Sequence, residues 1–320
     1  MLHGHRRQGV VERTSNARPP TSRHANISIL GPDRTLRGSM VHEVFSLHKI
    51  TIGDPIPFPF AVKDYQRYVF GDDKLAHRFG TDLAKAFIAH GPGFGHAHPT
   101  RLATTTTSNQ RPTDVAVAVL SGYVPTAIHS LRNHFVSCLN RHLIAIDARP
   151  ALKIDVYGIG EDPQARHGPQ AKPHVDRERL EARTLIVLSD IRMSQDWEER
   201  TSHSLRDLHI DNKIVFAYLA SPDEPAHTAA LSPILSFVAN PTIKEVESIA
   251  QADQFTMNEC FVQFVLGRDH VEFCQFVRRQ GDFSVRLLLD YAIGGKYYED
   301  EVYKQNVKFL LWDVEARESM

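Results

Sequence analysis

Apolar residues cluster along the chain in short runs that predict strands separated by helices. The runs with the character of strands are residues 41–50, 114–120, 151–157, 185–188 and 213–220. Most of the later runs lack regular polar–apolar alternation, which is typical of parallel strands buried on both faces by helices. The pattern therefore predicts an α/β fold built on a mostly parallel sheet.

Helical spacing fills the regions between and after these runs. Residues 72–90 place five apolar side chains on one helical face: Leu75, Phe79, Leu83, Ala86 and Phe87. A helix over residues 127–145 carries Cys138 on its apolar stripe, and after about residue 240 the pattern is almost entirely helical, with Cys274 on an apolar side. We therefore expect an α/β core at residues 40–238, a helical C-terminal subdomain at 239–320, and both thiols in core positions.

Two segments lack any sustained periodicity. Residues 1–39 are rich in Arg, His, Ser, Thr and Pro, which predicts a disordered basic extension, although an Arg-rich, acid-poor leader is also typical of organellar transit peptides. Residues 91–112 form a loop of Gly, Thr, His and Pro. His90, just before this loop, and His96 and His98 within it lack a carboxylate or cysteine at ligand spacing, so a solvated loop is favoured over a metal site.

Composition excludes several classes of protein. The formal net charge of the 320 residues is −1, so the chain as a whole does not attract nucleic acid or a membrane surface. The three cysteines are widely spaced and form no CxxC pair, which favours a reduced, cytoplasmic protein without a disulfide framework. No apolar run approaches the ~20 residues that a membrane-spanning helix needs. We expect neither a membrane nor a specific nucleic-acid partner.

The stretch "RTLIVLSDIRMSQDWEER" (residues 183–200) carries the candidate chemistry. Its predicted strand ends at Ser189-Asp190, a polar turn follows, and a helix is expected to begin near Asp196. Open α/β sheets bind ligands at the carboxyl ends of their strands, and a helix N-terminus favours phosphate. Asp190 could accept hydrogen bonds from ribose hydroxyls or hold Mg²⁺ through water. The alternative is that Asp190 only ends a strand and Asp196 only caps a helix.

This stretch is also similar to a segment of another protein class, but the rest of the chain lacks the other motifs of that class. "LIVLSDIRMS" is similar to the "DIRMP" phosphoacceptor segment of response-regulator receiver domains. A receiver also has two adjacent acids after its first strand and a Lys after a later one. The upstream strands here end in "VAVLSGYVP" and "IDVYGIGED", and the strand after Asp190 ends in "SPDE" instead of a small hydroxyl residue. A receiver is therefore not expected.

The stretch more closely resembles the loop of type I phosphoribosyltransferases that binds phosphoribosyl pyrophosphate (PRPP). That signature is a strand, two adjacent acids, an apolar residue, two variable positions, then Thr-Gly and small residues that open a helix. Asp190 matches the second acid and Ser194 the Thr, and "VAVAVLSGYVPTA" resembles the upstream pyrophosphate loop, with Ser121, Gly122 and Tyr123 in its turn. The resemblance implies a catalytic Asp190, with Mg²⁺ carried by PRPP. It assigns PRPP or phosphate binding to Ser189, Arg192, Met193, Ser194, Gln195 and Asp196.

Two longer segments resemble a narrower group. "SLHKITIGDPIPFPFAVKDYQRYVFGDDKLAHRFG" and "RDHVEFCQFVRRQ" are similar to the phosphoribosyltransferase-like proteins of bacterial tellurium-resistance and stress-response gene clusters. The resemblance covers Val41 to the C-terminus. It implies a cytoplasmic protein that binds a small ribose phosphate, with a second copy of the chain or other proteins of such clusters as partners.

The loop departs from the signature at several positions. Ser189 replaces the first acid, Gln195 replaces the Gly, and Asp196 and Trp197 replace small residues. Gln is disfavoured at the positive φ that Gly allows, and Asp196 brings negative charge towards a phosphate, which Arg192 could offset by pairing with it.

Two functions follow from the resemblance and its departures. The first is transfer of a phosphoribosyl group from PRPP to an unknown acceptor, for which Tyr291, Lys296 and Tyr297 of the C-terminal part are guesses. The second is a catalytically inactive member of the same fold that serves as a nucleotide or PRPP sensor or as an assembly partner in a stress response. Asp190 and Ser194, which match the signature, favour the first function. The positions that depart from the signature, Ser189, Gln195 and Asp196, favour the second.

Overall fold

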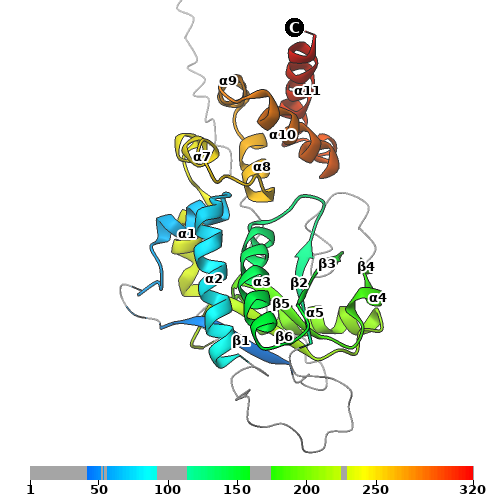
Figure 1. Ribbon diagram of the computed structural model, residues 1–320. Helices are drawn as coiled ribbons and strands as arrows, with labels where there is room; N and C mark the ends of the chain where they lie inside the picture. Colours follow the sequence, from blue (N-terminus) through cyan, green and yellow to red (C-terminus); the bar gives the residue numbers. More distant parts are fainter. Residues whose placement is uncertain are drawn as a thin grey trace, which may run out of the picture.

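The computed structural model describes residues 42–51, 53, 56–91, 114–158, 174–224 and 229–319 (Figure 1). The predicted extension at residues 1–39 and the histidine loop beyond residue 91 lie outside these residues. His90 lies at the end of a helix and is exposed.

In the described residues the strands form one six-stranded sheet in the order β1-β6-β5-β2-β3-β4. The strands are β1 (Glu43–Ile50), β2 (Val115–Ser121), β3 (Leu152–Tyr157), β4 (His174–Val175), β5 (Thr184–Ile191) and β6 (Ile214–Pro222). All neighbours pair in parallel except the short β4, which is antiparallel to β3. The predicted α/β fold with a mostly parallel sheet is confirmed.

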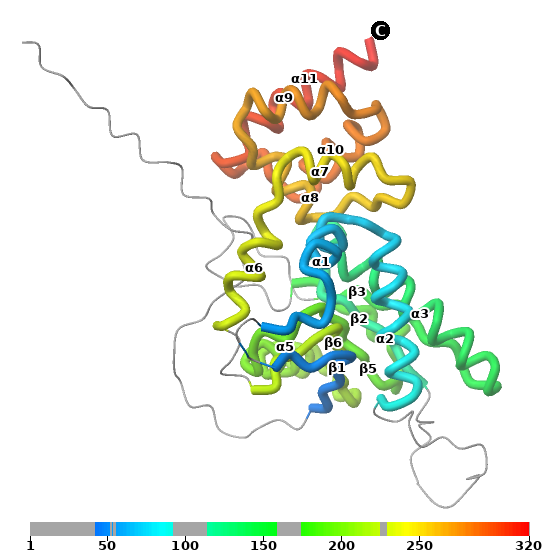
Figure 2. Tube along the Cα trace, turned by 90° about the vertical axis from the view of Figure 1, so that its left-hand side faces the viewer, coloured from blue at the N-terminus to red at the C-terminus, as the bar shows by residue number. Residues whose placement is uncertain are grey.

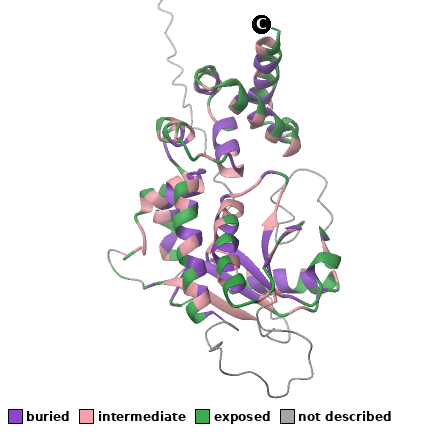
Figure 3. Cartoon of the chain, in the orientation of Figure 1, coloured by how far each residue is buried: buried purple, intermediate pink, exposed green. Residues whose placement is uncertain are grey.

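Helices cover both faces of this sheet, as the apolar runs predicted. One face is covered by α1 (Val62–Val69), α2 (Asp73–His90), α3 (Ala127–Ala145) and α6 (Ser232–Ala239). The other face is covered by α4 (Arg177–Leu180) and α5 (Gln195–Asp207). Each face of the sheet has its own hydrophobic core. Alternate residues of each strand contribute to one core or the other, because successive side chains of a strand point to opposite faces. Figure 3 shows buried residues on the strands and on parts of the helices around them.

The C-terminal helices enclose a core of their own. They are α7 (Ile243–Ala250), α8 (Glu259–Leu266), α9 (His270–Arg278), α10 (Asp282–Gly294) and α11 (Lys304–Glu318), with a 3₁₀ turn, η2, at Tyr297–Glu299. Their buried side chains, among them Phe261, Phe273 and Leu310, pack together and meet the α/β part through Phe70 and Val124. Figure 2 shows this helical unit beyond α1 and α2, at one end of the molecule. Across the described residues no helix has the length and apolar character to span a membrane.

A short backbone junction fixes the helical unit to the core. The Thr256 N–H donates to the Gly71 carbonyl (2.9 Å), and the Asp73 N–H donates to the Gln254 carbonyl (2.9 Å). Gly71 has φ +103°, and a Cβ at this position would lie 2.3 Å from the Thr256 oxygen. Only glycine satisfies both the left-handed backbone and the close approach, so Gly71 sets how the two parts meet.

Candidate functional site

The strand order of the sheet changes direction between the neighbouring strands β2 and β5. From β2 the chain passes through α3 to β3 on one side, and from β5 it passes through α5 to β6 on the other. The β2–β5 pairing ends at Ala118↔Val187, whereas the β5–β6 pairing continues to Ile191↔Ala220. The carboxyl ends of β2 and β5 therefore separate. Open α/β sheets bind their ligands in the crevice at such a reversal.

The two predicted loops lie on either side of this crevice. The register Ala118↔Val187, continued by three residues, brings Ser121 level with Asp190. Strand β5 is longer than the sequence suggested, because it continues through Asp190 to Ile191. The turns after β2 and after β5 thus lie at the same edge of the sheet, one on each side of the crevice.

Asp190 is half-buried in the crevice and receives two hydrogen bonds. The Tyr65 hydroxyl of α1 donates to Oδ2 (2.8 Å), and the Ile191 N–H donates to Oδ1 (2.7 Å). Burial raises the pKa of Asp190 above its ordinary value, while these two hydrogen bonds oppose that rise. Each carboxylate oxygen can accept a second hydrogen bond, so Asp190 keeps acceptor capacity for a ligand.

Two tyrosines that the sequence reading missed surround this carboxylate. Tyr65 and Tyr68 lie on α1, a helix that was not expected after the Pro-rich loop, and both are buried. Burial, followed by the charge of Asp190, raises the pKa of both phenols well above the ordinary value, so both remain protonated donors. The Tyr68 hydroxyl has no hydrogen-bond partner among the described residues. Their spacing of three residues in "DYQRYVF" was the available signal for one helical face.

The helical unit adds Cys260 to this side of the crevice. Cys260 stands in the first turn of α8. Burial, with Glu259 and Asp190 contributing, raises the pKa of its thiol to about 12. The thiol therefore stays protonated at neutral pH and is not a nucleophile prepared for reaction.

A family model described as PRTase ComF-like matches residues 41–310. The chain belongs to this family. It is thus a phosphoribosyltransferase-like protein, in agreement with the strand-and-loop signature at residues 183–200. No curated protein and no solved structure gives a significant match.

The loop after β5 differs in detail from the phosphoribosyltransferase signature. Ser194 is the N-cap of α5 and accepts a hydrogen bond from the Trp197 N–H (3.2 Å), so the helix begins at Gln195 and Asp196 lies in its first turn. Gln195 is helical, without positive φ, so the expected steric strain of replacing Gly does not arise here. Gln195 and Asp196 are exposed, and Met193 packs against the core.

Ser189 faces away from Asp190. Leu188 and Ile186 belong to the core under α1–α3, and Val187 and Leu185 belong to the core under α5. The alternation of the strand therefore places Ser189 on the α5 side, in register with Tyr218.

Arg192 is held by a buried glutamate. Its Nε and Nη2 donate to the two carboxylate oxygens of Glu198 at 2.6 and 2.8 Å. Glu198 has no exposed surface and also receives the Tyr218 hydroxyl (2.7 Å) and meets His42 Nε2 (2.8 Å). The predicted pairing of Arg192 with a phosphate stays a prediction, and two of the five guanidinium N–H donors are already used by Glu198.

The turn after β2 is braced by a histidine. His129 Nδ1 accepts the Thr126 N–H (2.9 Å), so in the neutral ring Nε2 carries the proton, and Nε2 lies 3.2 Å from Ser121 Oγ and 3.6 Å from Asp155. Burial, then Arg132, lowers the pKa of His129, with Asp155 opposing. Activation of a serine requires an unprotonated nitrogen facing the hydroxyl. This Ser–His–Asp group therefore positions the turn and does not form a nucleophile.

The helical unit also covers the β2 turn. The Glu259 N–H donates to the Pro125 carbonyl (2.8 Å). The ring of Tyr123, although 77% exposed, lies so close to Gly294 that a Cβ there would be 2.7 Å from it. Of the three guessed acceptor residues, Tyr291 is half-buried, Tyr297 is buried with its hydroxyl 3.4 Å from Glu259, and Lys296 is exposed. Their role stays a prediction.

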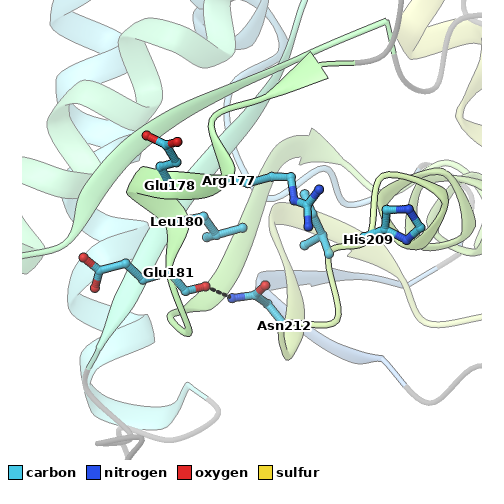
Figure 4. Close-up of a pocket in the computed structure, with 7 residues that line it drawn as sticks. Arg177, Glu178, Leu180, Glu181, His209 and Asn212 are labelled. Atoms are coloured by element: carbon cyan, nitrogen blue, oxygen red, sulfur yellow. Dashed lines mark hydrogen bonds between the residues drawn. The ribbon is translucent and has the colours of Figure 1, made fainter.

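A separate hollow of about 500 Å³ lies at the opposite edge of the sheet, before β5 and β6. Its lining is Arg177, Glu178, Leu180, Glu181, His209, Ile210 and Asn212. The Asn212 side chain donates to the Glu181 carbonyl (2.9 Å), while the carboxylates of Glu178 and Glu181 point away from Arg177 and His209 (Figure 4). No set of groups in this hollow converges on one ligand chemistry, so we place the candidate site in the crevice.

Proposed function

We propose that the protein binds PRPP or a related ribose phosphate in the crevice between β2 and β5 and transfers its phosphoribosyl group to an acceptor. One observation carries this proposal. The β2 turn and the Asp190 loop, far apart in sequence, flank the point where the sheet reverses, and two protonated tyrosines lie beside the carboxylate. The family match is consistent with this use of the edge.

Each segment has a defined task in this proposal. Asp190 accepts hydrogen bonds from the ribose hydroxyls and stabilises positive charge that develops on the ribose as pyrophosphate departs. Backbone N–H groups at the start of α5 bind the 5′-phosphate, favoured by the positive end of the helix. The turn at Ser121–Tyr123 offers further N–H groups to the pyrophosphate. Most of the rate enhancement would come from holding the reactants in position.

The residues at this edge fit a Mg²⁺ ion that enters with its substrate. The described residues contain no group of three or more His, Cys, Asp or Glu side chains that could bind a metal alone. Mg²⁺ is commonly bound by one or two carboxylates together with substrate phosphates. Asp190, half-buried and with acceptor capacity left, would hold it directly or through water. Bound there, the ion would neutralise pyrophosphate charge.

A second role has its own support. Arg192 is engaged by Glu198, Gln195 replaces the loop glycine, and only one of the two signature acids is present. In this second version the crevice binds a nucleotide or PRPP without turnover, and the protein acts as a sensor or assembly partner in a stress response. A second copy of the chain or other proteins of the gene cluster would be its partners.

Calorimetry with PRPP and Mg²⁺ tests both versions. We expect measurable heat, and we expect Asp190→Asn to weaken binding at least several-fold. Absence of heat at millimolar PRPP would contradict both ligand-binding roles. If PRPP binds, release of pyrophosphate in the presence of candidate bases separates the enzyme from the sensor.

A further inference from the structure

The last helix, α11, carries a stripe of exposed side chains opposite the face that it buries. Its buried residues, one or two per turn, are Asn306, Val307, Leu310, Asp313 and Val314. Residues three and four apart share a helical face. On the opposite side of α11 such a set consists of Lys308, Leu311, Trp312 and Glu315, all of them exposed. We call these four residues the α11 stripe.

Two apolar side chains form the middle of the α11 stripe. Leu311 is 46% exposed and Trp312 is 59% exposed. The other tryptophan of the chain, Trp197, is half-buried and packs against the aromatic rings of β6. The Trp312 ring lies 5.7 Å from the ring of Phe309, which packs on the core of the helical unit, so the indole is supported on one side but not covered. Supported, exposed aromatic rings of this kind are typical anchors of protein interfaces.

The two ends of the α11 stripe carry opposite charges. Lys308 precedes the apolar pair and Glu315 follows it, about 10 Å further along the helix axis. The ion pairs that α11 makes within the described residues use four other side chains, namely Lys304, Asp313, Arg317 and Glu318. Lys308 and Glu315 therefore present their charges to the solvent on either side of an apolar centre.

This arrangement is complementary to a copy of itself. The midpoint between positions 308 and 315 is also the midpoint between positions 311 and 312. In an antiparallel pair of α11 helices related by a two-fold axis through this midpoint, Lys308 of each copy lies opposite Glu315 of the other. Leu311 and Trp312 each lie beside their own equivalents. A parallel pair would instead place like charges together, which disfavours that orientation.

We propose that the α11 stripe pairs antiparallel with the same stripe of a second copy of the chain. Leu311 and Trp312 supply the apolar contact, and the two Lys308–Glu315 pairs set its orientation and register. Helix α11 lies at the end of the molecule farthest from the sheet (Figures 1 and 2), so two copies can meet there with their α/β cores apart. One helix from each copy makes a small interface, and we expect a Kd on the order of micromolar.

Sedimentation equilibrium of the full chain between about 1 and 200 µM tests this pairing, and it requires no ligand in the crevice. We expect a monomer–dimer equilibrium in this range. Trp312→Ala should raise the Kd of the dimer at least about tenfold, because it removes the central anchor. The matched control is Phe237→Ala, which truncates a ring that is 45% exposed on α6, in the α/β core, and should leave the Kd unchanged. Thermal unfolding verifies that both variants are folded.

Exchange of the two charges tests the antiparallel orientation. Lys308→Glu places two acids opposite each other at both ends of the contact, and Glu315→Lys does the same with two lysines. Each single variant should raise the Kd at least several-fold. The double variant, with both substitutions, restores opposite charges across the axis and should return the Kd to near that of the parent. A general effect of either substitution on α11 would not be reversed by the other.

A cysteine placed near the axis tests the register. Leu311→Cys should form a disulfide between two copies under mild oxidation, located by mass spectrometry. Lys304→Cys, on the same helix, should not, because its equivalents lie about 22 Å apart in the antiparallel pair. A monomer throughout the concentration range, a dimer that is equally tight in Trp312→Ala, a double charge variant that does not recover, or equal cross-linking of the two cysteine variants would overturn the proposal.

Discussion

Asp190 and Glu198 stand eight residues apart on either side of one loop, and their surroundings are opposite. Each accepts a tyrosine hydroxyl, from Tyr65 at 2.8 Å and from Tyr218 at 2.7 Å. Glu198 has no exposed surface, and its two oxygens are further occupied by Arg192 and His42. Asp190 is half-buried, its hydrogen-bond partners among the described residues are neutral donors, and burial raises its pKa. A carboxylate with a cation partner serves the fold, whereas one left with acceptor capacity at a sheet edge is suited to a ligand.

The largest expected effect comes from Glu198→Gln. Removal of one partner of a buried ion pair leaves the other charge uncompensated, at a cost of about 3 kcal/mol or more. Urea unfolding should show this loss. Glu199→Gln, one position further on the same helix but only partly buried, is the matched control and should change the free energy of unfolding by less than about 0.5 kcal/mol. Equal stability of the two variants would mean that the Arg192 contact has no structural role.

Tyr65→Phe comes next. It removes the donor to the Asp190 carboxylate, and hydrogen bonds to charged groups contribute about 1.5–3 kcal/mol. It also removes an influence that lowers the pKa of Asp190, so that pKa should rise further. NMR titration of the labelled carboxyl group, together with unfolding, measures both. An unchanged Asp190 titration would show that Tyr65 does not act on the carboxylate.

Asp190→Asn should affect binding more than stability. The folded-state pKa of Asp190 is raised, so its protonation favours the folded state, and this stabilisation is lost as pH rises through the folded-state pKa. Above that pH the ionised carboxylate destabilises the folded state. The free energy of unfolding of Asp190→Asn should therefore differ from that of the parent by no more than about 1 kcal/mol. PRPP affinity should nevertheless fall several-fold. A large stability loss with unchanged affinity would reverse the roles assigned to Asp190 and Glu198.

Tyr68→Phe should have the smallest effect on the protein without ligand. Its hydroxyl is buried and has no hydrogen-bond partner among the described residues, so its removal should leave the free energy of unfolding equal or up to about 1 kcal/mol higher. If the hydroxyl donates to bound ribose phosphate, calorimetry will show weaker PRPP binding at the same time. Weaker folding in Tyr68→Phe would instead indicate a hidden partner for this hydroxyl.

The two acids also show how far sequence reasoning reaches. The position of Asp190 at the end of a strand could be predicted, because a run of four apolar residues followed by a polar turn is a local pattern. Glu198 could not be recognised, since an acid in the first turn of a helix normally interacts with the helix dipole at the surface. Its burial depends on β6 and on His42, far away in the chain.

The same limit applies to the groups around the two acids. Tyr65 meets Asp190 across 125 residues, and His42 meets Glu198 across 156. Neither pairing leaves a trace in local periodicity. The start of α5 was predicted near Asp196, whereas its N-cap is Ser194, two residues earlier. Ser and Asp both have side chains that cap helices, so only the backbone geometry distinguishes the two positions.

By itself, the sequence determined the alternation of strands and helices, the mostly parallel sheet and the loop that resembles a PRPP site, because apolar periodicity and turn chemistry are local properties. Only the tertiary structure decided that β2 and β5 part at the reversal of the sheet, that Arg192 is bound to Glu198, and that Tyr65 and Tyr68 lie beside Asp190. Those outcomes depend on which distant segments share a core, and contacts of that kind form only when the chain is folded.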